Sequence, residues 1–331
     1  MNPEFSVKSS WFKDHLKGLV FGQAVGDALG LGAEFMSKTE VASRYGETGL
    51  HSYSQIIQDR HRRNWPIGSW TDDTDQMLCI FDSLLENHSV DIYDIAHRIH
   101  SWVKGGGRGI GQLTSMAVSS NIFLSDPHSA AKEAWIMTAK RAASNGGVMR
   151  TSILGAWEYT SLEKVKENAE RVCRITHYDP RCVGSCVAVS IAISLLLQGE
   201  TEIKKIFDSV IQHTSEYSPE IIRFLQKARE ESIESLNLDE GYKPREPNCI
   251  GYTFKAMSAG FWSLMHASSF EQGILQIVNE GGDADTNAAV AGAMLGARDG
   301  FDCIPYRLTA ELQNGSDLER RVNELLERLD Q

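Results

Sequence analysis

The sequence predicts an all-α fold, a compact multi-helix bundle built as a single domain over residues 1–331. Period-two alternation of strand-favouring residues is scarce, whereas apolar residues recur at helical spacing through most of the chain. No Pro- or Ser-rich linker separates the helical segments, which is the pattern of one domain. Two irregular stretches, at about 45–69 and 237–250, are expected to be surface loops.

Helical periodicity is clearest just after Thr71–Thr74, where apolar residues follow the i, i+3, i+4, i+7, i+8 spacing of one helix face. These residues are Met77, Ile80, Phe81, Leu84 and Leu85. Similar patterns predict further helices at about 91–104, 128–142, 161–175, 183–198, 219–235, 252–266, 270–279, 286–297 and 317–329. About ten such helices need a multilayer arrangement to bury their apolar faces.

The composition predicts a cytoplasmic protein without nucleic-acid or membrane partners. Forty-four acidic and 33 basic residues give a formal charge of −11, which disfavours a broad basic surface for nucleic acid. Six scattered cysteines and an N-terminus without an apolar leader favour reduced thiols in the cytoplasm. The apolar run Val183–Gln198 contains three serines and is too short to span a bilayer, so a buried core helix is expected.

Two segments far apart in the sequence share one arrangement, in which glycine precedes clustered Asp and Thr and a helix follows. They are Gly68–Asp75 (GSWTDDTD) and Gly281–Thr286 (GGDADT). A single Asp or Thr suffices to cap a helix. Several acids at one helix start repel each other, and this repulsion favours a bound cation over capping alone.

If the two helix starts face each other, they supply four carboxylates and two hydroxyls for metal binding. The candidate ligands are Thr71, Asp72, Asp73, Asp283, Asp285 and Thr286. The carboxylates balance two divalent cations, and a set made only of oxygen ligands favours Mg²⁺ or Mn²⁺. Two such ions lower the pKa of a bound water and hold a substrate oxygen, so the pattern predicts metal-assisted hydrolysis.

Further candidates lie near the first of these segments in the sequence. In GQAVGDALG, glycines at 22, 26 and 30 line one helix face and permit close packing. Glu34, flanked by apolar residues, is either a general acid–base or an ordinary surface residue. The basic cluster Arg60–Arg63 either contacts a phosphate or an acidic partner, or is simply solvated.

Two glycine-rich stretches and one histidine complete the candidates. The loops 105–111 (GGGRGIG) and 144–150 (SNGGVMR) either present backbone N–H groups to phosphates or are plain turns. Neither has the pattern of a nucleotide-binding Walker or Rossmann loop. His177 beside Tyr178 either contacts a nucleotide or is a satisfied buried histidine.

Taken together and in order, six motifs make the sequence resemble the ADP-ribosylglycohydrolase family over about residues 16–300. The motifs are GDALG with Glu34, TDDTD at 71–75, RGIG, NGGVMR, ITHYD and GGDADTNAA at 281–289. This family includes dinitrogenase reductase activating glycohydrolase and the ADP-ribosylarginine hydrolases. The resemblance implies an all-α fold, a binuclear Mg²⁺ or Mn²⁺ centre, and release of ADP-ribose from a modified protein side chain.

The resemblance also implies roles for particular residues. Metal ligands fall on the six Thr and Asp residues named above, and Glu34, Asp73 and Asp285 are the implied catalytic residues. The implied ADP-ribose-binding residues are Gly109, Ile110, Gly111, Asn145, Gly146, Gly147, His177 and Tyr178. Because GDALGLGAEFM is closer to arginine-directed bacterial members than to serine-directed ones, arginine-linked ADP-ribose is the expected substrate. Serine- or other O-linked hydrolysis, ADP-ribose binding without turnover, and a metal phosphohydrolase are the alternatives.

Overall fold

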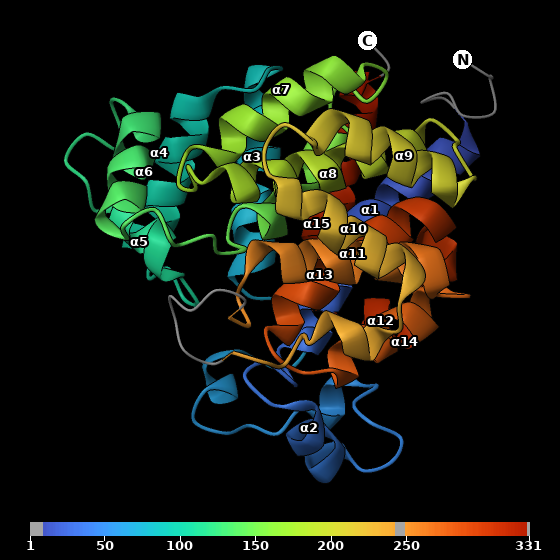
Figure 1. Ribbon diagram of the computed structural model, residues 1–331. Helices are drawn as coiled ribbons and strands as arrows, with labels where there is room; N and C mark the ends of the chain where they lie inside the picture. The colour runs from blue at the N-terminus through green and yellow to red at the C-terminus, as the bar shows by residue number, and fades with distance from the viewer. Residues whose placement is uncertain (1–8, 242–248, 330–331) are drawn as a thin grey trace.

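The computed structural model describes residues 9–241 and 249–329, which contain fifteen α-helices joined by loops and short 3-10 turns (Figure 1). Within these ranges the structure has no β-strand, and the all-α prediction is confirmed. The helices are α1 (Ser10–Gly30), α2 (Lys38–Tyr45), α3 (Asp72–Asn87), α4 (Ile92–Lys104), α5 (Gln112–Val118), α6 (Pro127–Met137), α7 (Leu162–Cys173), α8 (Pro180–Leu197), α9 (Ile203–Thr214), α10 (Pro219–Glu230), α11 (Thr253–His266), α12 (Phe270–Asn279), α13 (Ala284–Asp299), α14 (Tyr306–Ala310) and α15 (Gly315–Leu329).

Most predicted helices lie within a few residues of an observed helix, but two end earlier than predicted. The segment predicted as 128–142 stops at Met137, because Ala139 and Lys140 adopt left-handed φ values of 54° and 59°. The segment predicted as 219–235 stops at Glu230 and is followed by a short 3-10 turn. Four helices were not predicted individually: α2, α5, α9 and α14.

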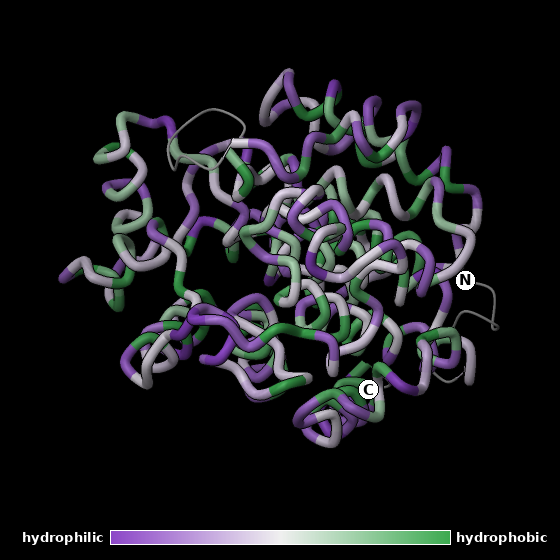
Figure 2. The backbone as a smooth tube through the Cα atoms, turned by 90° about the horizontal axis from the view of Figure 1, so that it is seen from below, coloured by the Kyte–Doolittle hydropathy of each residue, from purple (hydrophilic) through white to green (hydrophobic). Residues whose placement is uncertain are grey.

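Helix α8 lies inside the bundle, as the run Val183–Gln198 predicts. Among the described residues it is the one helix long and apolar enough to cross a membrane, and 83% of that window is buried in the fold. Its serines donate to backbone carbonyls, for example Ser190 to Thr151 and Ser194 to Tyr159. On other helices, hydrophilic and hydrophobic residues alternate within single turns (Figure 2), as expected for helices that bury one face.

The closest helix pair is α1 with α13, and it depends on small residues, as the glycine spacing predicts. The two helices are antiparallel: Gly18 faces Gly296, Gly22 faces Gly292 and Gly26 faces Ala288. A Cβ added to Gly292 would lie 2.7 Å from the carbonyl carbon of Gly22, so the backbones touch directly. This register brings the C-terminal end of α1 beside the N-terminal end of α13.

The predicted loop 45–69 is largely irregular, with only two 3-10 turns, Tyr53–Gln55 and Arg62–Asn64. It lies with α2 at one end of the bundle (Figure 1). Of the second predicted loop, 237–250, residues 242–248 are outside the described residues. The six cysteines are all free thiols, and Cys182 and Cys186 are buried in α8.

Candidate active site

Asp27, near the end of α1, fixes the start of α3. Its Oδ1 accepts hydrogen bonds from the backbone N–H (2.9 Å) and hydroxyl (2.8 Å) of Thr71. Its Oδ2 accepts from the N–H (3.0 Å) and hydroxyl (2.7 Å) of Thr74. Burial raises the pKa of Asp27 to about 7, although these four donors lower it. A carboxylate from another helix thus satisfies the N–H groups that a local cap would otherwise bind.

The acidic residues at the two helix starts are therefore not serving as caps. Thr71, the N-cap residue of α3, and Asp283, the N-cap residue of α13, make no side-chain capping hydrogen bond. Asp283 instead accepts from the amide of Asn145 at 2.8 Å. The capping alternative does not account for the acids at these positions.

Glu34 is held against the start of α13 by the backbone. The N–H of Phe35 donates to the carbonyl of Gly282, and the N–H of Gly282 donates to the carbonyl of Met36, both at 2.7 Å. Gly282 has a φ of 73°, and a Cβ there would lie 2.7 Å from the carbonyl carbon of Leu238. Only glycine fits this junction, which places the Glu34 carboxylate near Asp283 and Asp285.

The carboxylates form two neighbouring groups that share Asp285. In one group, an oxygen from each of Asp27, Asp73 and Asp285 lies within 4.8 Å of the others, and in the second the same holds for Glu34, Asp283 and Asp285. Burial first, and then repulsion between the acids, raises the pKa values of Asp73 and Asp285 well above the usual range for aspartate. So many buried acids at one place need a positive counter-charge to be ionised together.

The donor set fits hard divalent cations. Asp73 Oδ1 is buried and has no hydrogen-bond partner, and the surrounding donors are carboxylate and hydroxyl oxygens. Oxygen-only sets of this kind suit Mg²⁺ or Mn²⁺, whereas Zn²⁺ favours nitrogen and sulfur ligands. An orphaned buried carboxylate oxygen in the middle of the cluster is the atom that a cation would satisfy.

The six predicted ligands occupy different positions in this arrangement. Asp73, Asp283 and Asp285 belong to the two carboxylate groups. The Thr71 hydroxyl donates to Asp27 and also lies 3.2 Å from Asp73 Oδ2. Asp72 and Thr286 line the adjacent cleft. Asp27 belongs to the GDALG motif but is not among the predicted ligands, and the structure places its carboxylate in the first group.

A cleft of about 530 Å³ opens from this cluster. The sequence-predicted residues that line it are Glu34, Asp72, Asp73, Gly109, Gly111, Asn145, Gly146, His177, Asp283, Asp285 and Thr286. Three predicted ADP-ribose-binding residues, Ile110, Gly147 and Tyr178, are not among the lining residues. Gly147 packs against the buried thiols of Cys173 and Cys186, and the Tyr178 ring lies 5.9 Å from that of Trp135.

Glycines let the backbone approach the cluster and the histidine. Gly109 has a φ of 92°, and a Cβ there would lie 3.0 Å from Asp72 Cγ. A Cβ on Gly146 would lie 2.8 Å from Cε1 of His177. Side chains at these two positions would displace residues that line the cleft, which explains why both predicted loops carry glycine here.

His177 is buried and neutral. Burial lowers its pKa to about 3, and the nearby Arg150 guanidinium acts in the same direction. Its Nε2 lies 2.9 Å from the Ser144 hydroxyl and its Nδ1 lies 2.8 Å from the Thr176 hydroxyl. Both ring nitrogens are thus fixed by hydroxyl groups, which can act as donor or acceptor.

Arg150 connects this histidine to the acidic side of the cleft. It is fully buried and donates to Gln76 Oε1 and Thr176 Oγ1, each at 2.7 Å. The Gln76 amide in turn donates to Asp72 at 3.2 Å. A buried guanidinium that contacts only neutral groups is uncommon, and here it lies behind a cluster of carboxylates. The sequence motif NGGVMR contains Arg150, but the connection to Asp72 was not predicted.

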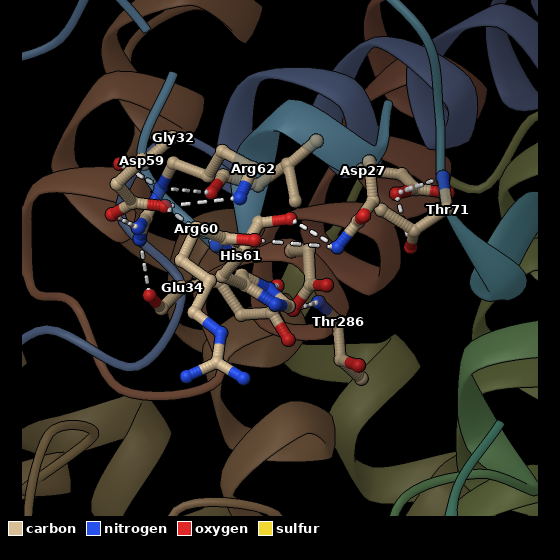
Figure 3. Close-up of polar contacts among 12 residues, drawn as sticks. Asp27, Gly32, Glu34, Asp59, Arg60, His61, Arg62, Thr71 and Thr286 are labelled. Atoms are coloured by element: carbon tan, nitrogen blue, oxygen red, sulfur yellow. Dashed lines mark hydrogen bonds and ion pairs between the residues drawn. The ribbon is translucent and has the colours of Figure 1, made fainter. Parts of the chain in front are cut away.

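The basic cluster Arg60–Arg63 is divided between structural and exposed roles. Arg62 is buried and donates to the carbonyls of Leu31, Gly32 and Glu34 (Figure 3). His61 Nε2 lies 2.6 Å from Glu34 Oε2, and this hydrogen bond raises the pKa of His61. Arg60 and Arg63 are exposed.

Comparison with known proteins shows the family to which the chain belongs. A family model described as ADP-ribosylglycohydrolase matches residues 9–331. The chain is 25% identical to ADP-ribosylarginine hydrolase Tri1 of Serratia proteamaculans over 99% of this chain and 82% of the relative. It is also 25% identical to ADP-ribosyl-(dinitrogen reductase) glycohydrolase of Rhodospirillum rubrum, over 95% and 96% of the two chains.

A solved structure shares the fold. A chain of an ADP-ribosylglycohydrolase-related protein complex superposes with a TM-score of 0.74 at 25% identity, covering 96% of this chain and 99% of that one. The family match extends over nearly all of the chain and includes both acidic motifs and the loops around the cleft. This protein therefore belongs to the ADP-ribosylglycohydrolase family and is a hydrolase that acts on glycosyl bonds.

Proposed function

We propose that this protein hydrolyses the N-glycosidic bond between ADP-ribose and an arginine side chain of a modified protein. The observation that carries the proposal is the meeting, in one cleft, of a buried carboxylate cluster and glycine-rich backbone. The cluster is suited to the reacting ribose and the glycine-rich wall to the diphosphate. The motifs of the GDALGLGAEFM segment and the arginine-directed name of the Serratia relative favour the arginine linkage.

The cleft wall away from the acids is suited to ADP-ribose. Gly109 and Gly146 let the backbone lie close to Asp72 and His177, and Gly111 adds no side chain to the same wall; backbone N–H groups of this wall are proposed to bind the diphosphate. The Asn145 amide can make hydrogen bonds besides the one to Asp283, and the neutral His177 ring lines the cleft without adding charge. In the proposed complex these groups orient the diphosphate and the riboses, so that the scissile bond lies at the carboxylates.

We infer that two Mg²⁺ or Mn²⁺ ions act as cofactors at the carboxylate cluster. The proposed ligands are Thr71, Asp72, Asp73, Asp283, Asp285 and Thr286, and the cluster geometry adds Asp27 and Glu34 as further candidates. Such ions would polarise a ribose hydroxyl and lower the pKa of water at the site. The unpartnered Asp73 Oδ1 is the observation that supports a cation here.

The protein's own groups would handle the protons of the reaction. Water adds through its oxygen to the anomeric carbon of the distal ribose, the bond from that carbon to the guanidino nitrogen breaks, and the nitrogen gains the proton that the water loses. Glu34 or Asp73 is positioned to accept the proton from water. Burial raises the pKa of Glu34, and its hydrogen bond from His61 keeps the carboxylate oriented. Asp285, shared by both carboxylate groups, is proposed to orient the reacting groups.

Release assays on defined substrates test the linkage. Peptides that carry ADP-ribose on arginine or on serine are incubated with the enzyme and Mg²⁺ or Mn²⁺, and free ADP-ribose is measured. Release from the arginine peptide supports the proposal, and release from the serine peptide alone would overturn the arginine assignment. Binding of ADP-ribose without release from either peptide would instead indicate a non-catalytic binding protein. AMP among the products would indicate a phosphohydrolase.

Variants test the carboxylate cluster. Asp73→Asn and Asp285→Asn should each reduce the rate of release at least about 100-fold while the chain stays folded, because each removes a cluster charge. Asp75→Asn is the matched control: Asp75 lies in the same turn of α3, but accepts from Trp70 and Trp102 instead of joining the cluster. Normal rates in both cluster variants would refute the role of these acids.

A further inference from the structure

Three exposed arginines are neighbours, in the sequence, of residues at the cleft: Arg60 and Arg63 flank the His61–Arg62 pair that contacts Glu34, and Arg108 precedes the lining residue Gly109. Arg60 and Arg63 lie on either side of His61 and Arg62, and in the described part of the chain neither guanidinium has a hydrogen bond or ion pair. In Figure 3 no dashed contact reaches the guanidinium of Arg60. Arg108 approaches from the RGIG loop, where its guanidinium lies 5.7 Å from the Trp65 ring and donates to the carbonyl of Asn64. We call Arg60, Arg63 and Arg108 the arginine rim.

The segment that carries the rim is held firmly in place. Arg62, only 3% exposed, binds the backbone of the turn that contains Glu34 and pairs with Asp59 at 2.6 Å. Asp59 also accepts from the backbone N–H groups of His61 and Arg62, each at 3.0 Å. The alternation of a buried Arg62 with exposed neighbours therefore fixes the backbone from which the Arg60 and Arg63 side chains reach into solvent.

An exposed aromatic ring lies in the cleft next to His61. Phe35 is 52% exposed, lines the cleft, and lies 5.2 Å from the His61 ring. Its φ of 60° is an uncommon and strained conformation for a bulky residue. A strained backbone that holds an apolar ring in water beside Glu34 is typical of a binding surface, since exposure and strain both oppose folding stability.

We propose that the arginine rim and Phe35 form the docking surface for an acidic face of the ADP-ribosylated protein, around the modified side chain. The inference rests on the proposed function, because a protein substrate must approach the carboxylates through the cleft. Charge complementarity identifies the partner: the rim concentrates unpaired positive charge on a chain of net charge −11, and arginine with an exposed aromatic residue is the composition of protein interfaces. The overall negative charge opposes a nucleic-acid partner.

The experiment compares carriers of opposite charge. An acidic and a basic carrier protein are each modified with ADP-ribose on arginine, and kcat/KM for release is measured beside that for ADP-ribosylated free arginine. The wild-type enzyme should favour the acidic carrier. The double variant Arg60→Glu, Arg63→Glu should lose about 10-fold or more in kcat/KM on the acidic carrier, while the small substrate changes less than about twofold. The loss should be expressed mainly in KM.

A control and two contrary outcomes complete the test. Arg223→Glu with Arg328→Glu makes the same change in charge at exposed residues of α10 and α15, and should leave the preference for the acidic carrier unaltered. An equal loss on the small substrate would mean that the rim contacts ADP-ribose itself, and would overturn the proposal. An unchanged preference in the double variant would also overturn it.

The test separates docking from the chemistry. If arginine-linked substrates are not cleaved, the same carriers modified on serine show whether the acidic preference and its loss occur with another linkage. If the wild-type enzyme releases ADP-ribose from neither linkage, the proposed function fails. Binding of the acidic carrier to wild type and to the double variant then tests docking alone, with at least about a 10-fold weaker Kd expected for the variant.

Discussion

Replacing Gly26 by alanine tests whether the packing of α1 on α13 sets the geometry of the active site. Gly26 lies beside Asp27 in the sequence and faces Ala288, one turn into α13 from Asp285. The carboxylates of Asp27 and Asp285 belong to the same group of candidate metal ligands, so any separation of the two helices moves one carboxylate relative to the other. The substitution adds one methyl group and changes no charge.

The expected effect follows from the distances. A Cβ on Gly26 would lie 2.5 Å from the backbone carbonyl carbon of Ala288, whereas nonbonded carbon atoms prefer about 3.5–4.0 Å. Neither helix backbone can swing away as a side chain would, so the helices must separate by about 1 Å. Overpacking of this kind costs about 1–3 kcal/mol. A misplacement of about 1 Å in an active site lowers the rate by about 100-fold.

Thermal unfolding and ADP-ribose release measure the two effects on the same preparation. Gly26→Ala should lower the melting temperature by several degrees and the rate by about 100-fold. Gly18→Ala, at the far end of the same helix contact, should destabilise similarly but reduce the rate less. Gly315→Ala meets only ordinary contacts and should cause neither change. Wild-type stability and rate in Gly26→Ala would refute the argument that direct backbone contact positions the carboxylates.

Three further predictions concern the buried network, pH and the strained residue. Arg150→Met should weaken both Mn²⁺ and ADP-ribose binding about 10-fold in calorimetry. Gln76, which contacts Asp72, and Thr176, which contacts His177, would both lose the hydrogen bond that Arg150 donates. Unchanged affinities would contradict this expectation. The cation-free chain should lose thermal stability as the pH rises from about 4 to about 7.5. Carboxyls with raised pKa values, about 7 for Asp27, contribute stability that is complete below their unfolded pKa and is lost as the pH rises through the folded one. Mn²⁺ should reverse this trend, and a melting temperature in EDTA that does not fall with pH would contradict it. Phe35→Gly should leave the melting temperature unchanged or higher, because glycine accepts a φ of 60°. The value of kcat/KM should fall more on a modified protein than on a small substrate. Equal losses on the two substrates would contradict the docking role of Phe35.

The helical architecture could be predicted from the sequence because each helix carries its own periodicity. Helix α12 was predicted at its observed bounds. Helix α9 was missed although its buried residues Ile206, Phe207 and Val210 have helical spacing, so the signal was available. Helix α6 ends before its predicted end because Ala139 and Lys140, which follow it, adopt left-handed conformations. Neither residue type indicates that conformation in the sequence.

The candidate site was predictable only where charge itself carried the information. The repulsion among acids in the two motifs indicated a cation, and the structure brings Asp73 and Asp285 together as that argument requires. Asp27 gave no such signal, because a single Asp in a glycine-rich helix is equally compatible with packing. Its role depends on Thr71 and Thr74 from another helix. Sequence neighbours also diverge: His177 lines the cleft, whereas the Tyr178 ring packs on Trp135.

The arrangement links the stability of the core to the occupancy of the site. Helix α1 contributes both the glycine face that contacts α13 and the Asp27 carboxylate of the first group, so the core and the cluster share one helix. Without a cation, mutual repulsion of buried acids at this junction opposes the close approach that the glycines permit. A cation that binds only the folded chain would remove that repulsion and stabilise the whole domain by mass action, by about 3 kcal/mol at a concentration 100 times its Kd. Cation binding should therefore raise the melting temperature of the whole chain. The net charge of −11 gives no indication of this coupling, because most of the acidic residues lie outside the cluster.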